Sequence, residues 1–319
     1  MPVPFALDKA QLIALFVNSL LFGAFSVLYA IASWTLLYRN NRTRQHLTVF
    51  AVSTGLWVLS IAYSSLTVHR ALKAFSLNAR QPDGALVFYS NISSASAVAK
   101  DAIYVTTLLL GDGFLTYRLF IVWNRAWWIT VVPILLVLGT AASGYGACVE
   151  LITTFVTLGS SFFFGPPTLP PLLATLYSLP VATNLLLTAL IAGRITWTLV
   201  GTSKRDVLVV SNWHWEVLET VIESAFISSA GLVALLSTYL VDSNAMYICM
   251  EAVQPLIGLN FALIILRVHF RGARQDQAPS ALRRPAGVQL PGNISGSAPL
   301  RLSLSTSGYT LQRETTSKT

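Results

Sequence analysis

Seven long runs of mostly apolar residues dominate this sequence and restrict what it can fold into. They cover approximately residues 11–38, 45–68, 97–123, 126–148, 171–200, 217–241 and 245–270. A helix of about 20 apolar residues is long enough to cross the hydrocarbon core of a bilayer. A segment inside that core must satisfy its own backbone hydrogen bonds, which a helix does. We therefore predict an all-α integral membrane bundle of seven transmembrane helices.

The low content of charged residues supports this fold class. Only 11% of the 319 residues are Asp, Glu, Lys or Arg, whereas a soluble domain has about 25%. Such a composition excludes a soluble enzyme and a disordered regulator, and two cysteines exclude a disulfide scaffold. The first apolar run is too long for the core of a signal peptide, so we expect it to be retained as a membrane anchor.

The distribution of positive charge predicts the orientation of the bundle. With seven spans, sixteen of the 21 Lys and Arg residues fall on one side of the membrane, and five fall on the other. Lys and Arg are retained on the cytoplasmic side during insertion. We therefore expect an outer N-terminus and a cytoplasmic C-terminus, in the plasma membrane. The net charge of +8 is explained in this way, without a nucleic-acid partner.

The predicted domains follow from these boundaries. Residues 1–10 form a short outer N-terminus, residues 11–271 the transmembrane domain and residues 272–319 a cytoplasmic tail. The tail is rich in Ser, Thr, Pro, Arg and Gly, a composition that cannot bury a core and predicts disorder. Among three Asn-x-Ser/Thr sequons, only Asn91 lies on the outer side, where it can be glycosylated. Cys148 and Cys249 belong to spans that we do not expect to be neighbours, so no disulfide is predicted.

Ionisable residues inside the spans are the candidate functional residues, because burying a charge in a bilayer is costly. Asp112 lies near the middle of the third span between two glycines, and Arg118 lies at its cytoplasmic end. In the sixth span, Glu219 and Glu223 share one helical face. We predict that Arg118 pairs with Glu219 or Glu223, and that this contact is a switch between the two spans. The alternative is that Arg118 extends to the membrane surface as an ordinary end-of-helix arginine.

Three further polar residues are candidates on the same grounds. Arg194 ends the fifth span, and Glu251 and Asn260 lie in the seventh span on either side of Pro255. Glu251 is near the outer end of its span, where simple solvation is the alternative to a functional role. No zinc, phosphate-loop or nucleophile-elbow motif is present. We therefore predict no metal, no cofactor and no catalytic residue.

Several short motifs resemble a family of seven-helix membrane proteins from basidiomycete (mushroom-forming) fungi. The third span carries Gly111-Asp112, Tyr117-Arg118-Leu119 and Val122-Trp123, and the seventh carries Pro255-Leu256-Ile257-Gly258. Arg194-Ile195-Thr196-Trp197, Glu223-Ser224-Ala225 and the run 263–268 also match. The resemblance covers about residues 10 to 270 and implies the seven-span architecture; some members are described only as receptor-like. The outline is also similar to G-protein-coupled receptors, but Tyr117 precedes Arg118 where those receptors have an acid.

The leading functional prediction is an orphan receptor-like sensor. A small or lipophilic ligand would enter from the outer side or the bilayer, and a cytoplasmic signalling protein such as a G protein would detect the change. The second hypothesis is a transporter or channel for a small solute, with Asp112, Glu223 and Asn260 along its path. The third is an intramembrane lipid- or terpenoid-modifying enzyme that uses Asp112 and Glu223 as acids.

Overall fold

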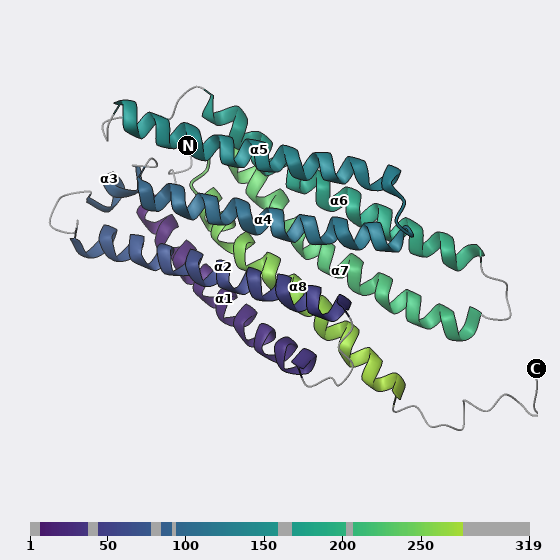
Figure 1. Ribbon diagram of the computed structural model, residues 1–319. Coiled ribbons are helices and arrows are strands. Elements are labelled where there is room, and N and C mark those ends of the chain that lie inside the picture. Colours follow the sequence, from purple (N-terminus) through teal and green to yellow (C-terminus); the bar gives the residue numbers. More distant parts are fainter. Residues whose placement is uncertain are drawn as a thin grey trace, which may run out of the picture. The chain divides into compact units, whose positions relative to one another are not determined.

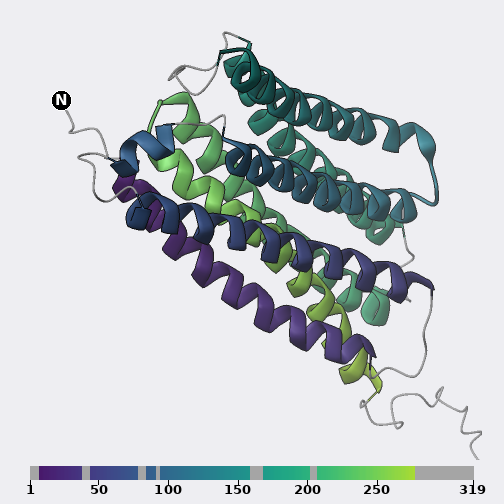
Figure 2. The ribbon, with the colours of Figure 1, turned by 60° about the vertical axis from the view of Figure 1, so that its left-hand side comes forward.

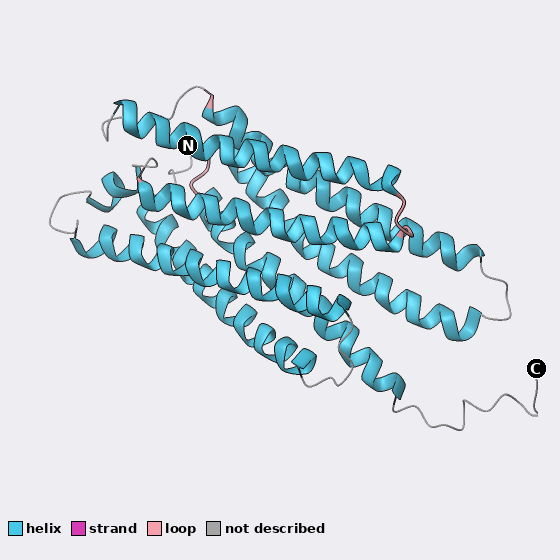
Figure 3. Cartoon of the chain, viewed as in Figure 1, coloured by secondary structure: helices cyan, strands magenta, loops and turns pink. Residues whose placement is uncertain are grey.

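The computed structural model describes residues 7–37, 44–77, 84–90, 94–158, 168–201 and 207–276. These residues form helices joined by short turns, and no strand occurs among them (Figure 3). The elements in chain order are α1 (Leu7–Leu37), α2 (Arg44–Leu72), the π-helical turn η1 (Lys73–Leu77), α3 (Gly84–Ser90), α4 (Ala95–Val122), α5 (Trp127–Leu158), α6 (Leu169–Gly201), α7 (Val207–Leu240) and α8 (Ala245–Asp276). Asn91 and the predicted tail from residue 277 onward lie outside the described residues.

Six of the described helices are long and apolar enough to cross a membrane: α1, α2, α4, α5, α6 and α8. In α7 the apolar stretch among the fully described residues, Ala225–Leu240, is shorter. The chain is therefore an all-helical, multi-pass membrane protein. The helices follow the predicted runs closely, although α5 extends to Leu158 and α7 begins at Val207. The short helix α3 was not expected from the sequence.

The helices pack side by side in a bundle with α4 at its centre (Figures 1 and 2). α4 contacts α2, α5, α6 and α8, whereas α7 packs between α6 and α8. The first and last helices, α1 and α8, also lie against each other and close the bundle. Because α4 is surrounded by these helices, the buried side chain of Asp112 in its middle lies among them.

The bundle has two ends, which we call the inner and the outer half. The inner half contains the C-terminal ends of α4 and α6 and the N-terminal part of α2, and it is the half that the charge distribution predicts to face the cytoplasm. The outer half contains the opposite ends. A cluster of buried aromatic and aliphatic side chains fills the interior of the outer half, and it includes Tyr63, Tyr104, Val105, Tyr177 and Leu235. A second cluster, with Phe25, Leu56, Phe114 and Phe261, joins α1, α2, α4 and α8.

Two of the closely packed glycines, Gly111 and Gly258, lie where α8 meets its neighbours. A Cβ atom at Gly258 would lie 2.5 Å from the ring of Phe25, and a Cβ at Gly111 would lie 2.9 Å from Ile257. These glycines therefore permit α8 to approach α1 and α4. Gly113, on the other side of Asp112, has no neighbouring atom within 4 Å of the corresponding position.

Large apolar side chains cover the outside of the bundle, as expected of a surface that faces lipid. Several exposed tryptophans lie toward the inner half, at the end of α1 (Trp34, 72% exposed), the start of α5 (Trp127 and Trp128, 65% and 92%) and the end of α6 (Trp197, 76%). Tryptophan prefers the interface between headgroups and acyl chains. These residues therefore mark the level at which the inner half meets the membrane surface.

Candidate functional site

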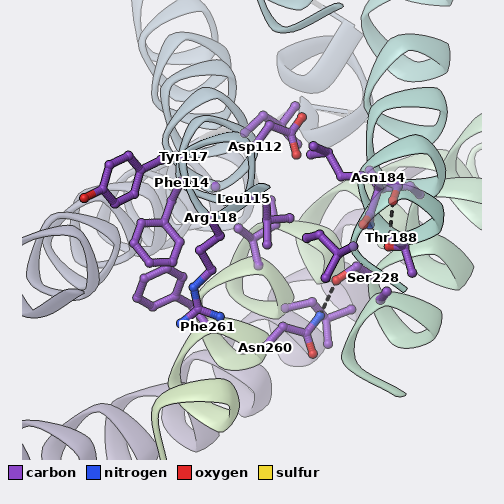
Figure 4. A pocket seen from close by; sticks show the side chains of 18 of the residues that line it. Asp112, Phe114, Leu115, Tyr117, Arg118, Asn184, Thr188, Ser228, Asn260 and Phe261 are labelled. Atoms are coloured by element: carbon purple, nitrogen blue, oxygen red, sulfur yellow. Dashed lines mark hydrogen bonds between the residues drawn. The ribbon is translucent and has the colours of Figure 1, made fainter. Parts of the chain in front are cut away.

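The inner half of the bundle contains a cavity of about 500 Å³ between α4, α6, α7 and α8 (Figure 4). Its walls are mostly apolar and include Leu108, Leu115, Leu187, Leu232 and Ile257. The exposed residues among those that line it are Tyr117, Ile121 and Val122, all in the last turns of α4. The exposed part of the described cavity wall therefore lies at the inner end of α4.

Asp112 lies in the wall of this cavity and is 8% exposed. Its Oδ2 atom has no hydrogen-bond partner among the described residues. A buried carboxylate oxygen without a donor is unusual, because desolvation of the charge is then uncompensated. Asp112 is thus the clearest candidate in the cavity for binding a group that donates a hydrogen bond or carries positive charge.

Asn260 brings a second polar group to the cavity. Its Nδ2 atom donates a hydrogen bond to the Oγ of Ser228, which joins α8 to α7. The Oδ1 atom of Asn260 is buried and, like Oδ2 of Asp112, has no partner among the described residues. Asn184, which is 4% exposed, contributes an amide from α6.

Arg118 lies in the same wall, six residues beyond Asp112 and so about 9 Å further along the axis of α4. Its guanidinium lies 4.8 Å from the centre of the Phe114 ring, a cation–π contact. Figure 4 shows Asp112 and this guanidinium at opposite ends of the site, with the Asn260–Ser228 bond on the Arg118 side. Asp112 and Arg118 are the charged residues among the described lining residues. The cavity therefore has a carboxyl group at its deep end and a guanidinium near its mouth.

The predicted pairing of Arg118 with α7 stays a prediction. The side chain of Glu219 lies outside the described part of the chain, and Glu223 is exposed and does not line the cavity. Arg194 also lies outside the cavity wall, with its guanidinium 5.2 Å from the ring centre of Trp123. The structure thus brings Asp112, Arg118 and Asn260 into one site and leaves Arg194 and Glu223 outside it.

Glu251 belongs to a different polar cluster, in the outer half. The expectation that it could simply be solvated is wrong, because the residue is 1% exposed. Its Oε1 atom lies 2.5 Å from Nζ of Lys100, in a salt bridge that joins α8 to α4. Its Oε2 atom accepts a 3.3 Å hydrogen bond from Thr67 of α2. The Lys100 ammonium also lies 5.4 Å from the centre of the Tyr63 ring.

The partners of Glu251 were not found by sequence reasoning. Lys100 is one of the five positive charges on the predicted outer side, although it lies inside the predicted third span. The missed signal is that a lysine and a glutamate occupy the outer ends of two spans, where pairing lowers the cost of burying both. Arg70 is a similar case, since it is 6% exposed and donates hydrogen bonds to Ser94 and Ser96.

Cys148 and Cys249 are free cysteines. No group of three His, Cys, Asp or Glu side chains suited to a metal ion occurs within the described ranges. Comparison of the chain with protein families, curated proteins and solved structures finds no match.

Proposed function

We propose that this chain is a seven-span, receptor-like membrane sensor with an outer N-terminus, and that a cytoplasmic partner recognises its inner half. In this proposal α7 also crosses the membrane and is the sixth of the seven spans. Membership of the basidiomycete seven-span family is part of the proposal. Gly111, Asp112, Tyr117 and Arg118, which carry the main motif of that resemblance, all line the cavity.

The observation that supports the proposal most is that the exposed residues of the cavity wall, Tyr117, Ile121 and Val122, lie at the inner end of α4. Toward the outer half, the interior is filled by the cluster around Tyr104 and Tyr177 and is tied by the Lys100–Glu251 salt bridge. A one-sided cavity suits a protein that presents a binding surface to a cytoplasmic partner. A channel requires a polar path through both halves.

The contacts around the cavity suggest how such a partner would sense the state of the bundle. The Phe114 and Phe261 rings, 4.5 Å apart, join α4 to α8, and the Asn260–Ser228 bond joins α8 to α7. A shift of α7 relative to α4 changes the shape of the cavity and the surroundings of Arg118. Coupling through a few packed contacts of this kind is how helix movements at one site affect another.

The test is association of the purified protein in lipid nanodiscs with a panel of fungal Gα subunits. We expect binding that a non-hydrolysable GTP analogue releases, and that Arg118→Ala weakens at least tenfold. Lys73→Ala is the matched control, because it removes an exposed cation from the outer half, and its binding is expected within twofold of wild type. Absence of nucleotide-sensitive binding by folded protein, or equal binding by Arg118→Ala, would contradict the proposal.

A transporter is the second candidate, favoured by the unpartnered oxygens of Asp112 and Asn260 in a cavity open to one side. Solute flux into liposomes that is abolished by Asp112→Asn would support transport. The intramembrane enzyme has no comparable support, since Glu223 does not join Asp112 in the cavity wall.

A further inference from the structure

We propose that the deep end of the cavity binds a hydrophobic amine, with its protonated nitrogen against Asp112 and its apolar body among the surrounding leucines. The proposed ligand class rests on the proposed function in one respect, namely that the ligand is a signal. Binding itself is a separate property of the cavity. It can be measured without any cytoplasmic partner.

The carboxylate of Asp112 favours a ligand with a positively charged hydrogen-bond donor. Its Oδ2 atom is buried without a donor among the described residues, at a depth where water provides little solvation. An ammonium group satisfies such an oxygen with a charge-assisted hydrogen bond, which is stronger than a neutral one. A neutral ligand that only donates a hydrogen bond therefore gains less from the same position.

The apolar surroundings of Asp112 favour a hydrophobic body for the same ligand. Leu108 and Leu232 lie at the deep end of the cavity and belong to the packed outer cluster that closes it. Leu115, Leu187 and Ile257 continue the apolar wall toward the mouth. A volume of about 500 Å³ is within the range of small-molecule sites, about 300–1,000 Å³, which are largely apolar with a few convergent polar groups.

The separation of charges fixes the orientation of the ligand. Arg118 lies about 9 Å from Asp112 along α4, so an ammonium near the mouth would be repelled and one at the deep end would not. An anionic ligand would instead meet the Arg118 guanidinium, which already lies against the Phe114 ring. Asn184 also lines the cavity and adds an amide to its wall.

The test uses 1-aminoadamantane as the probe and 1-adamantanol as its neutral counterpart of similar shape. Displaceable binding of the radiolabelled amine is measured on the full-length protein in nanodiscs, and the alcohol is tested as a competitor. We expect saturable amine binding to wild type and at least tenfold weaker competition by the alcohol. Asp112→Asn should weaken amine binding at least tenfold and remove the preference over the alcohol.

Two further variants keep the test decisive. Asp101→Asn changes the same residue type on the same helix, in the outer half and away from the cavity wall, and should bind the amine within twofold of wild type. Leu115→Trp fills the cavity while it retains the carboxylate, and should lose binding even if Asp112→Asn fails to fold. Thermal unfolding without ligand establishes which variants are folded.

Three results would overturn the inference: no saturable binding to folded wild type, equal affinity for amine and alcohol, or unchanged amine binding by folded Asp112→Asn or Leu115→Trp. Because no Gα subunit is present, failure here leaves the partner experiment unaffected. Conversely, amine binding without nucleotide-sensitive partner binding would uphold this site and contradict the receptor-like function.

Discussion

The buried salt bridge between Lys100 and Glu251 leads to an unequal prediction for its two partners. Glu251 is 1% exposed as a residue, and the side chains of Lys100 and Glu251 are 12% and 2% exposed. Removal of one partner from a buried ion pair costs about 3–5 kcal/mol in water-soluble proteins. In this bundle, however, the long Lys100 side chain lies near an end of its span and can extend toward the membrane surface.

The cost therefore depends on which charge is left behind. Glu251→Gln frees a lysine that can reach water, and we expect a loss of about 2 kcal/mol in the free energy of unfolding. Lys100→Met removes the cation beside the enclosed Glu251 carboxylate and leaves its hydrogen bond from Thr67. We expect a loss of about 3–5 kcal/mol in the free energy of unfolding. The double variant has neither charge of this pair left to bury, so its loss should be about that of Glu251→Gln alone.

The assay is unfolding of the purified protein in mixed micelles by titration with sodium dodecyl sulfate, followed by far-UV circular dichroism. Lys73→Met, which removes an exposed lysine, is the control and should stay within about 0.5 kcal/mol of wild type. Additive losses in the double variant, or a smaller loss for Lys100→Met than for Glu251→Gln, would refute the reasoning.

Two other predictions follow from packing and from charge. Gly258→Ala places a methyl group 2.5 Å from the buried Phe25 ring and should lower the free energy of unfolding by about 1–3 kcal/mol. Gly113→Ala meets no atom within 4 Å, so in the same titration it should be neutral or stabilising by up to about 1 kcal/mol. The orientation is tested with Val241→Cys and Asn124→Cys, each made in a protein whose two native cysteines are replaced by serine. A membrane-impermeant thiol reagent should label Val241→Cys on intact cells and Asn124→Cys only after permeabilisation. The reverse labelling pattern would show that the orientation inferred from the charge distribution is wrong.

The positions of the helices were predictable because hydropathy and length determine what can cross a bilayer. The six helices that qualify as spans follow the predicted runs, and the short helix α3 was missed because it lies between two of them. The burial of Asp112 was also predictable, since a lone carboxylate in the middle of an apolar run has nowhere else to lie.

The contacts between helices were less accessible to sequence reasoning. Gly111 and Gly113 looked equivalent on either side of Asp112, but residues two apart on a helix are rotated by about 200° and face different neighbours. Gly111 therefore meets Ile257, and Gly113 meets nothing within 4 Å. The pairing of Glu251 with Lys100 depends on which helices are adjacent, and no hydropathy pattern specifies that.

The exposed tryptophans of the inner half have a consequence for any ligand of the cavity. Residues 121 and 122, at its mouth, lie on the same end of the bundle as Trp127 and Trp128, so the entrance opens near the lipid headgroups. A hydrophobic amine would then reach the site from the inner leaflet, at a concentration set by its partition into lipid. Each buried methylene favours that partition by about 0.8 kcal/mol, roughly fourfold. Apparent affinities measured in water will therefore rise with the alkyl content of the ligand and fall as lipid is added.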